Sequence, residues 1–177
     1  MKKNFWLWTA LAQTVFALLF AAVFSIKENS YFIFTAAAVI QFALLQRNMT
    51  RYFIWFTIIF ALAAAVVITS EYTLLNYVSA LLWFFWIALF NFLIYNMLKT
   101  EQYEKLYFGS FILWIIAFGA VYAGMEFINI MLLKIEVMPG KKEIAPLFMG
   151  KMRAGIIMGI ALGLGYDIIQ LVFRKKA

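Results

Sequence analysis

Asp167 is an acidic residue within an apolar part of the sequence, where a charged side chain is least expected. It is the only aspartate of the chain, and it lies toward the C-terminal end of an apolar stretch that covers residues 154–173. A carboxylate inside a membrane-spanning helix costs at least ~2.5 kcal/mol unless it is paired or hydrated, so it marks a candidate substrate- or ion-binding site. Gln170 and Arg174 follow on about the same helix face. The structural alternative is therefore an Asp167–Arg174 ion pair, or a bond from Asp167 to a neighbouring helix.

Glu126 is the second acidic residue inside an apolar stretch, here residues 106–134. As with Asp167, its position makes it a candidate for binding a substrate or an ion. The structural alternative is a salt bridge with Lys151 or Arg153, which stand at the beginning of the last apolar stretch.

Two neutral polar residues, Asn91 and Gln13, also lie within apolar stretches and complete the candidate substrate- or ion-binding set. Amide side chains in such positions commonly hydrogen-bond across helices, with a modest net stabilisation. Helix-to-helix bonding is therefore the structural alternative for both.

Small residues recur at every fourth position of the last apolar stretch. Gly155, Gly159 and Gly163 form two overlapping GxxxG units, and Asp167 follows at the same spacing. Residues four apart are neighbours on a helix, so the glycines form a groove that another backbone can approach closely. The groove predicts close packing against a helix of the same chain, a second copy, a lipid tail or a helix of another membrane protein.

A basic segment, residues 134–153, precedes this stretch and contains both prolines of the chain. Its Pro139-Gly140 pair predicts a turn. Cations here could hold the phosphate of a lipid headgroup or dock an anionic protein. The alternatives are an ordinary solvated loop and a segment that re-enters the membrane, which requires burial in protein or contact with water. The predicted basic outer patch consists of Lys134, Lys141, Lys142, Lys151 and Arg153.

The sequence contains no histidine and no cysteine. It therefore excludes imidazole-ligated haem, Cys/His zinc sites, cysteine nucleophiles, disulfides and histidine general bases. It also contains no P-loop, HExxH or GxSxG motif. We therefore expect no catalytic residues, no cofactor and no metal site.

The composition places these residues in a membrane protein. Of 177 residues, 67% are hydrophobic and 13% are charged, against about a quarter charged in soluble domains. Six stretches approach the about 20 apolar residues that a spanning helix needs. They predict an all-α, polytopic membrane protein in which residues 1–177 form one bundle of six transmembrane helices without an extramembrane domain. The spans are expected at about residues 5–26, 31–46, 52–70, 74–98, 106–134 and 154–173.

The net charge of +7 comes from lysines and arginines at the ends of the apolar stretches. Cations in such positions set topology and contact lipid headgroups, so they do not indicate nucleic-acid binding. If the N-terminus is inside, nine of the 15 cations lie on the inner side. We therefore expect a multi-pass protein of the plasma or inner membrane, with both termini in the cytoplasm.

Two functions remain open. The first is a small transporter, or the membrane subunit of a transport system, with an unknown substrate. In size and layout alone the chain resembles the substrate-binding membrane subunits of energy-coupling vitamin transporters, whose first span also packs through an AxxxA face, here Ala17 and Ala21. The second is a non-catalytic assembly or scaffold protein that binds partner helices through the glycines or headgroups through the basic patch. The expected partners are the lipid bilayer and either a second copy or another membrane protein.

Overall fold

The computed structural model describes residues 4–27, 29–68, 74–99, 110–132 and 144–174. These residues form six helices, and no strand occurs among them, so the all-α prediction is confirmed for the described part of the chain. The helices are α1 (Phe5–Val23), α2 (Asn29–Gln46), α3 (Thr50–Ile68), α4 (Leu74–Leu98), α6 (Ser110–Leu132) and α7 (Ile144–Arg174).

Four of these helices are long and apolar enough to cross a membrane. The apolar stretches are Phe5–Val23 in α1, Ala80–Leu98 in α4, Ser110–Phe127 in α6 and Met149–Phe173 in α7. The helices α2 and α3 carry shorter apolar stretches, Tyr31–Gln46 and Thr50–Ala64. Large apolar side chains also cover the outside of the bundle, including Ile59, Val67 and Ile116, each more than 60% exposed. This surface is typical of a protein embedded in lipid.

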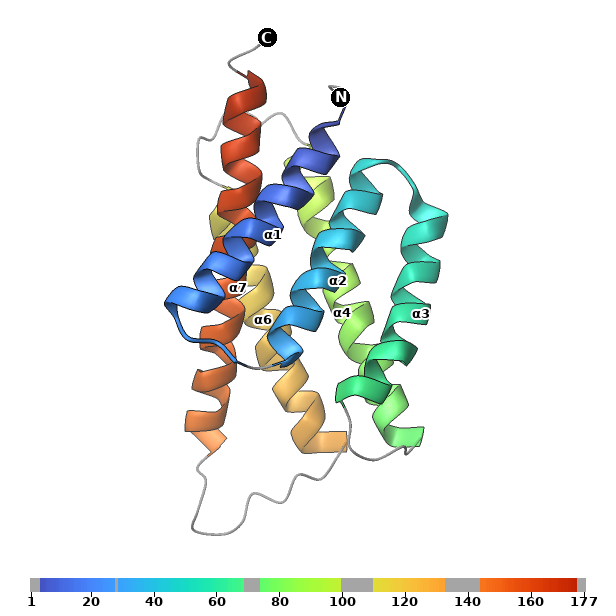
Figure 1. Ribbon diagram of the computed structural model, residues 1–177. Coiled ribbons are helices and arrows are strands. Elements are labelled where there is room, and N and C mark those ends of the chain that lie inside the picture. The colour runs from blue at the N-terminus through green and yellow to red at the C-terminus, as the bar shows by residue number, and fades with distance from the viewer. Residues whose placement is uncertain (1–3, 28, 69–73, 100–109, 133–143, 175–177) are drawn as a thin grey trace.

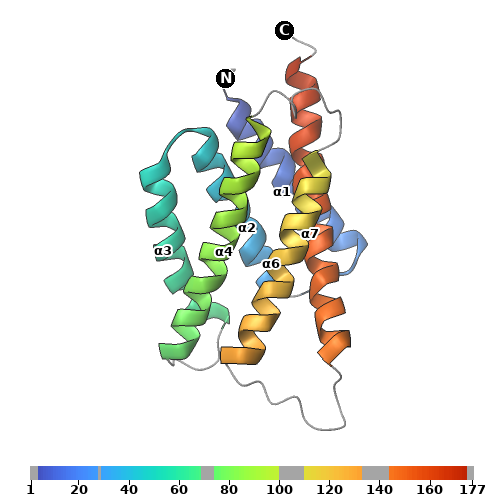
Figure 2. The same cartoon turned by 180° about the vertical axis from the view of Figure 1, so that it is seen from behind.

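The helices run in alternating directions, so that the start of α1 and the end of α7 lie at the same end of the bundle (Figure 1). The helices α6 and α7 lie side by side, and α1 packs along α7 (Figures 1 and 2). On the other side, α2 packs between α1 and α4 and contacts both. Helix α3 packs on the outside, against α2 and α4. The pair α6/α7 is therefore bounded by α1, α2 and α4.

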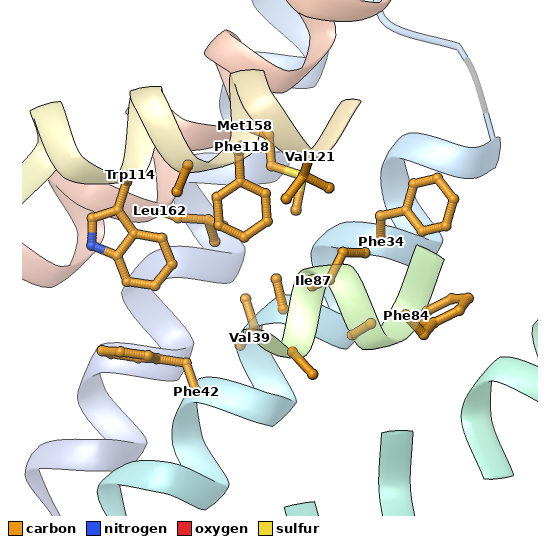
Figure 3. Close-up of a cluster of buried hydrophobic side chains, with 14 of the residues drawn as sticks. Phe34, Val39, Phe42, Phe84, Ile87, Trp114, Phe118, Val121, Met158 and Leu162 are labelled. Atoms are coloured by element: carbon orange, nitrogen blue, oxygen red, sulfur yellow. The ribbon is translucent and has the colours of Figure 1, made fainter. Parts of the chain in front are cut away.

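Aromatic and aliphatic side chains of α2, α4, α6 and α7 pack together in the interior of the bundle (Figure 3). The ring of Phe42 on α2 meets Trp114 on α6 edge-on, with 4.8 Å between the ring centroids. Earlier on α2, the ring of Phe34 meets those of Phe84 on α4 and Tyr122 on α6, with 5.5 and 6.0 Å between the ring centroids. These rings are almost fully buried and fix α2 against α4 and α6.

The last helix begins earlier than its predicted span. We expected a span at about residues 154–173, but α7 begins at Ile144. Pro146 does not interrupt it, because the third residue of a helix has no intrahelical hydrogen bond to lose. Lys151 and Arg153 therefore lie within a helix, so the alternative of an ordinary solvated loop does not apply to these two residues.

Candidate functional site

The glycines of α7 face α6. A Cβ added to Gly159 would lie 2.5 Å from the carbonyl oxygen of Trp114, and one added to Gly155 would meet the carbonyl oxygen of Phe118. A Cβ added to Gly163 would meet the Cα of Phe111. The groove that the sequence predicts is therefore covered by α6 of the same chain. It is not available to a partner helix.

A fourth glycine of α7, Gly165, packs against α1. A Cβ added there would lie 2.7 Å from the backbone nitrogen of Gln13. The Gln13 side chain, 1% exposed, donates from Nε2 to the carbonyl oxygen of Leu162 over 3.0 Å. The structure thus places Gln13 in the α1/α7 contact, as the structural alternative for this residue expected.

Asp167 lies at the junction of α7 with the first residue of α6. Its carboxylate is 2% exposed, and its Oδ1 accepts a hydrogen bond from the Oγ of Ser110. The proposed ionic partner of Asp167, Arg174, has a side chain outside the described part of the structure. Sequence reasoning missed Ser110, because a serine within the apolar stretch of residues 106–134 has no spacing that links it to a residue 57 positions away.

Glu126 is also buried, with 4% of its surface exposed. Within the described residues, its carboxylate has no hydrogen bond and no ion pair, so the salt bridge with Lys151 or Arg153 is not observed. Ser110, the partner of Asp167, precedes Glu126 by 16 residues on α6, which is about 24 Å at the helical rise. The two carboxylates therefore stand at opposite ends of the α6/α7 pair and do not form one site.

Asn91 belongs to a chain of buried polar groups that crosses three helices. Its Nδ2 donates to Gln41 Oε1 over 3.0 Å and to the carbonyl oxygen of Ala38 over 3.2 Å. Gln41 Nε2 in turn donates to Thr57 Oγ1 over 3.1 Å, which links α2 to α3. Asn91 Oδ1 is buried, and no hydrogen bond reaches it within the described residues. This acceptor can bind a donor inside the bundle.

No known protein family, curated protein or solved structure matches this chain. The resemblance in layout to vitamin-transporter subunits therefore has no support from a shared fold.

A cavity of about 260 Å³ opens on the side of α1 and α2. Its hydroxyl groups all donate to backbone carbonyls: Thr14 to Ala10, Thr35 to Tyr31, and Tyr31 to Ala17. Because these donors are already used, the cavity presents an apolar surface, as a lipid-facing depression does.

A second cavity, also of about 260 Å³, contains one residue of the predicted basic outer patch. Arg153 lines it together with Lys27 from the α1–α2 connection. Lys151 lies on the same turn of α7 but does not line this cavity. Three members of the patch, Lys134, Lys141 and Lys142, lie outside the described residues. Within the described part, no cluster of three or more potential metal-ligating side chains is found.

Proposed function

We propose that this protein is a six-span transport protein of the cell membrane, or the membrane subunit of a transport system, in which Asp167 binds and releases the coupling ion. The observation that carries the proposal is the buried carboxylate of Asp167 inside the apolar stretch Met149–Phe173. An ionisable group in such a position is costly and commonly marks an ion or substrate pathway. The hydroxyl of Ser110 supplies a partner that can orient the carboxylate.

The proposed topology places both termini in the cytoplasm. It counts α2 and α3 as spans in addition to the four long apolar helices. Aromatic–cation pairs at the end that holds both termini support this orientation. Arg47 lies 4.6 Å from the ring centroid of Trp6, and Lys99 lies 4.2 Å from that of Tyr95. Aromatic rings and cations gather where a helix leaves the lipid, and cations are enriched on the cytoplasmic side.

Replacing Asp167 with asparagine is expected to abolish transport and to leave the fold intact. Asparagine keeps an oxygen that accepts the bond from Ser110 but cannot bind a proton or a cation by charge. The measurement uses proteoliposomes with an internal pH dye or a radioactive cation, challenged with a panel of solutes. The unfolding temperature should stay within about 3 °C of the wild type, which corresponds to about 1 kcal/mol for a chain of this size.

The matched control is Glu126→Gln, because Glu126 is as buried as Asp167 but has no partner of this kind within the described residues. The proposal predicts that Asp167→Asn loses ion-coupled flux and that Ser110→Ala reduces it. The control Glu126→Gln should keep the flux of the wild type. If Asp167→Asn lowers the unfolding temperature and its flux equals that of the wild type, the carboxylate is structural and the proposal is wrong.

The alternative is a non-catalytic assembly or scaffold protein. The structure removes one of its two surfaces, because α6 covers Gly155, Gly159 and Gly163. What favours it is the basic cavity of Arg153 and Lys27, which offers cations for an anionic group. Purification in mild detergent distinguishes the two functions: a stoichiometric partner protein together with no solute flux would support assembly.

A further inference from the structure

The cavity at Arg153 lies where the α1–α2 connection passes beside α7 (Figure 1). Four consecutive residues of the connection form one wall, and α7 forms the other. Its volume is about 260 Å³, enough for a group of several non-hydrogen atoms. The lining residues are Phe24, Ser25, Ile26, Lys27, Gly150, Arg153, Ala154 and Ile157.

Two cations face this space without a counter-ion. Lys27 and Arg153 are both exposed, and within the described residues neither forms a hydrogen bond or an ion pair. A guanidinium presents parallel N–H donors that match two oxygens of a phosphate, and an ammonium adds a point charge. The hydroxyl of Ser25, which also lines the cavity, supplies a neutral donor.

The remaining wall is apolar. Ile157 and Ala154 are 5% and 7% exposed, and Phe24 and Ile26 stand opposite in the connection. A free, strongly hydrated anion gains nothing from such a wall. An anion attached to an apolar body can contact both halves of the cavity.

Two backbone features keep the cavity open. Ser25 adopts a left-handed conformation with φ 52°, and the N–H of Ile26 donates back to the carbonyl oxygen of Ala21 over 2.8 Å. This turn ends α1 and directs the chain alongside α7. Gly150 contributes the second feature, because a Cβ added there would meet nothing within 4 Å.

The cavity also lies at the boundary of the apolar surface. The apolar stretch of α1 ends at Val23, immediately before the lining residues, and that of α7 begins at Met149, immediately before Gly150. Cations at the end of a membrane-embedded stretch stand at the level of the lipid headgroups. The cavity is thus both charged and positioned for a group held at the membrane surface.

We propose that Lys27 and Arg153 form a binding site for the phosphate-bearing headgroup of an anionic lipid. The phosphate lies between the two cations, and the apolar wall of Ile157 and Ala154 contacts the part of the lipid below the headgroup. This site rests on the membrane location of the helices and not on the proposed transport activity.

The test measures lipid retention by native mass spectrometry of the full chain, purified and then equilibrated with equal amounts of phosphatidylglycerol and phosphatidylcholine. The wild type should retain phosphatidylglycerol preferentially. Each of Lys27→Gln and Arg153→Gln should reduce this preference about fivefold, since one cation near a lipid surface is worth about that factor. The matched control is Arg51→Gln, an exposed arginine at the start of α3, at the other end of the bundle, which should retain the preference.

A second variant tests the cavity without changing its charge. Because the space at Gly150 is open, Gly150→Leu should fold normally and fill the site, so the preference for phosphatidylglycerol should fall. Addition of inorganic phosphate separates the two sources of the anion. If free phosphate displaces the lipid from the wild type at equal concentration, or if Arg51→Gln weakens retention as much as Arg153→Gln, the headgroup site does not exist.

Discussion

Replacing Gly159 with alanine or leucine is expected to cause a large loss of stability. A Cβ at this position would lie 2.5 Å from the carbonyl oxygen of Trp114 and 2.6 Å from the Cα of Ile115. These are backbone atoms of α6, so no side-chain rotation can relieve the contact, and the two helices have to separate. Overpacking of this kind costs about 3 kcal/mol. For a chain of this size the unfolding temperature should fall by about 6–12 °C.

The control for this prediction is Gly150→Ala, on the same helix. An added methyl group there meets nothing within 4 Å. Alanine also favours a helix over glycine by up to about 1 kcal/mol, so this variant should be as stable as the wild type or slightly more stable. Both variants are measured by thermal unfolding in the same detergent, followed by tryptophan fluorescence. Equal unfolding temperatures for Gly159→Ala and the wild type would contradict the packing described for α6 and α7.

The glycine spacing illustrates what sequence could predict here. Three glycines at every fourth position indicate a face for close packing, since that depends only on helical periodicity. They do not say which helix covers the face, because α6, a second copy and a lipid tail all fit a smooth groove equally well. Only the folded chain shows the partner, because there the backbone of Trp114 and Phe118 lies against these glycines.

The polar residues also show which contacts could be predicted from the sequence and which could not. Asp167 and Asn91 stand out in the sequence because a polar residue in an apolar stretch is rare. Ser110, which donates to Asp167, and Thr57, which accepts from Gln41, do not stand out. Serine and threonine are tolerated in a helix through a bond to their own backbone. Likewise Lys27 is a single cation in a short connection, and only the folding of α1 along α7 places it beside Arg153.

Helix α7 begins at Ile144, before the predicted span of residues 154–173, for a physical reason. Two prolines, a Pro-Gly pair and a group of cations make residues 134–153 look like a loop. Proline, however, is compatible with the first turn of a helix, and lysine and arginine are good helix formers. Once α7 begins at Ile144, Pro146 has no cost, and Arg153 is held at a fixed place on a helix.

Replacing Gln41 with methionine is expected to cause the second large loss of stability. Gln41 is fully buried and is the central member of the polar chain: its Oε1 accepts from Asn91, and its Nε2 donates to Thr57. Methionine has nearly the same size, so packing changes little. The amide of Asn91 then loses the bond of one N–H in addition to its unpartnered Oδ1. An unsatisfied buried polar group costs about 1–3 kcal/mol, so the unfolding temperature should fall by about 2–12 °C.

The double variant Gln41→Met with Asn91→Leu should be more stable than Gln41→Met alone, because it removes the amide that the first change leaves unsatisfied. Thr57 needs no compensation, since its hydroxyl already donates to the carbonyl oxygen of Phe53 over 2.8 Å. The control is Asn96→Leu on the same helix as Asn91: Asn96 is exposed and donates only to the carbonyl oxygen of Phe92. A thermodynamic cycle of these variants gives the coupling between Gln41 and Asn91. A coupling of zero would mean that the two amides do not stabilise each other, which would contradict the role of the polar contact between α2 and α4.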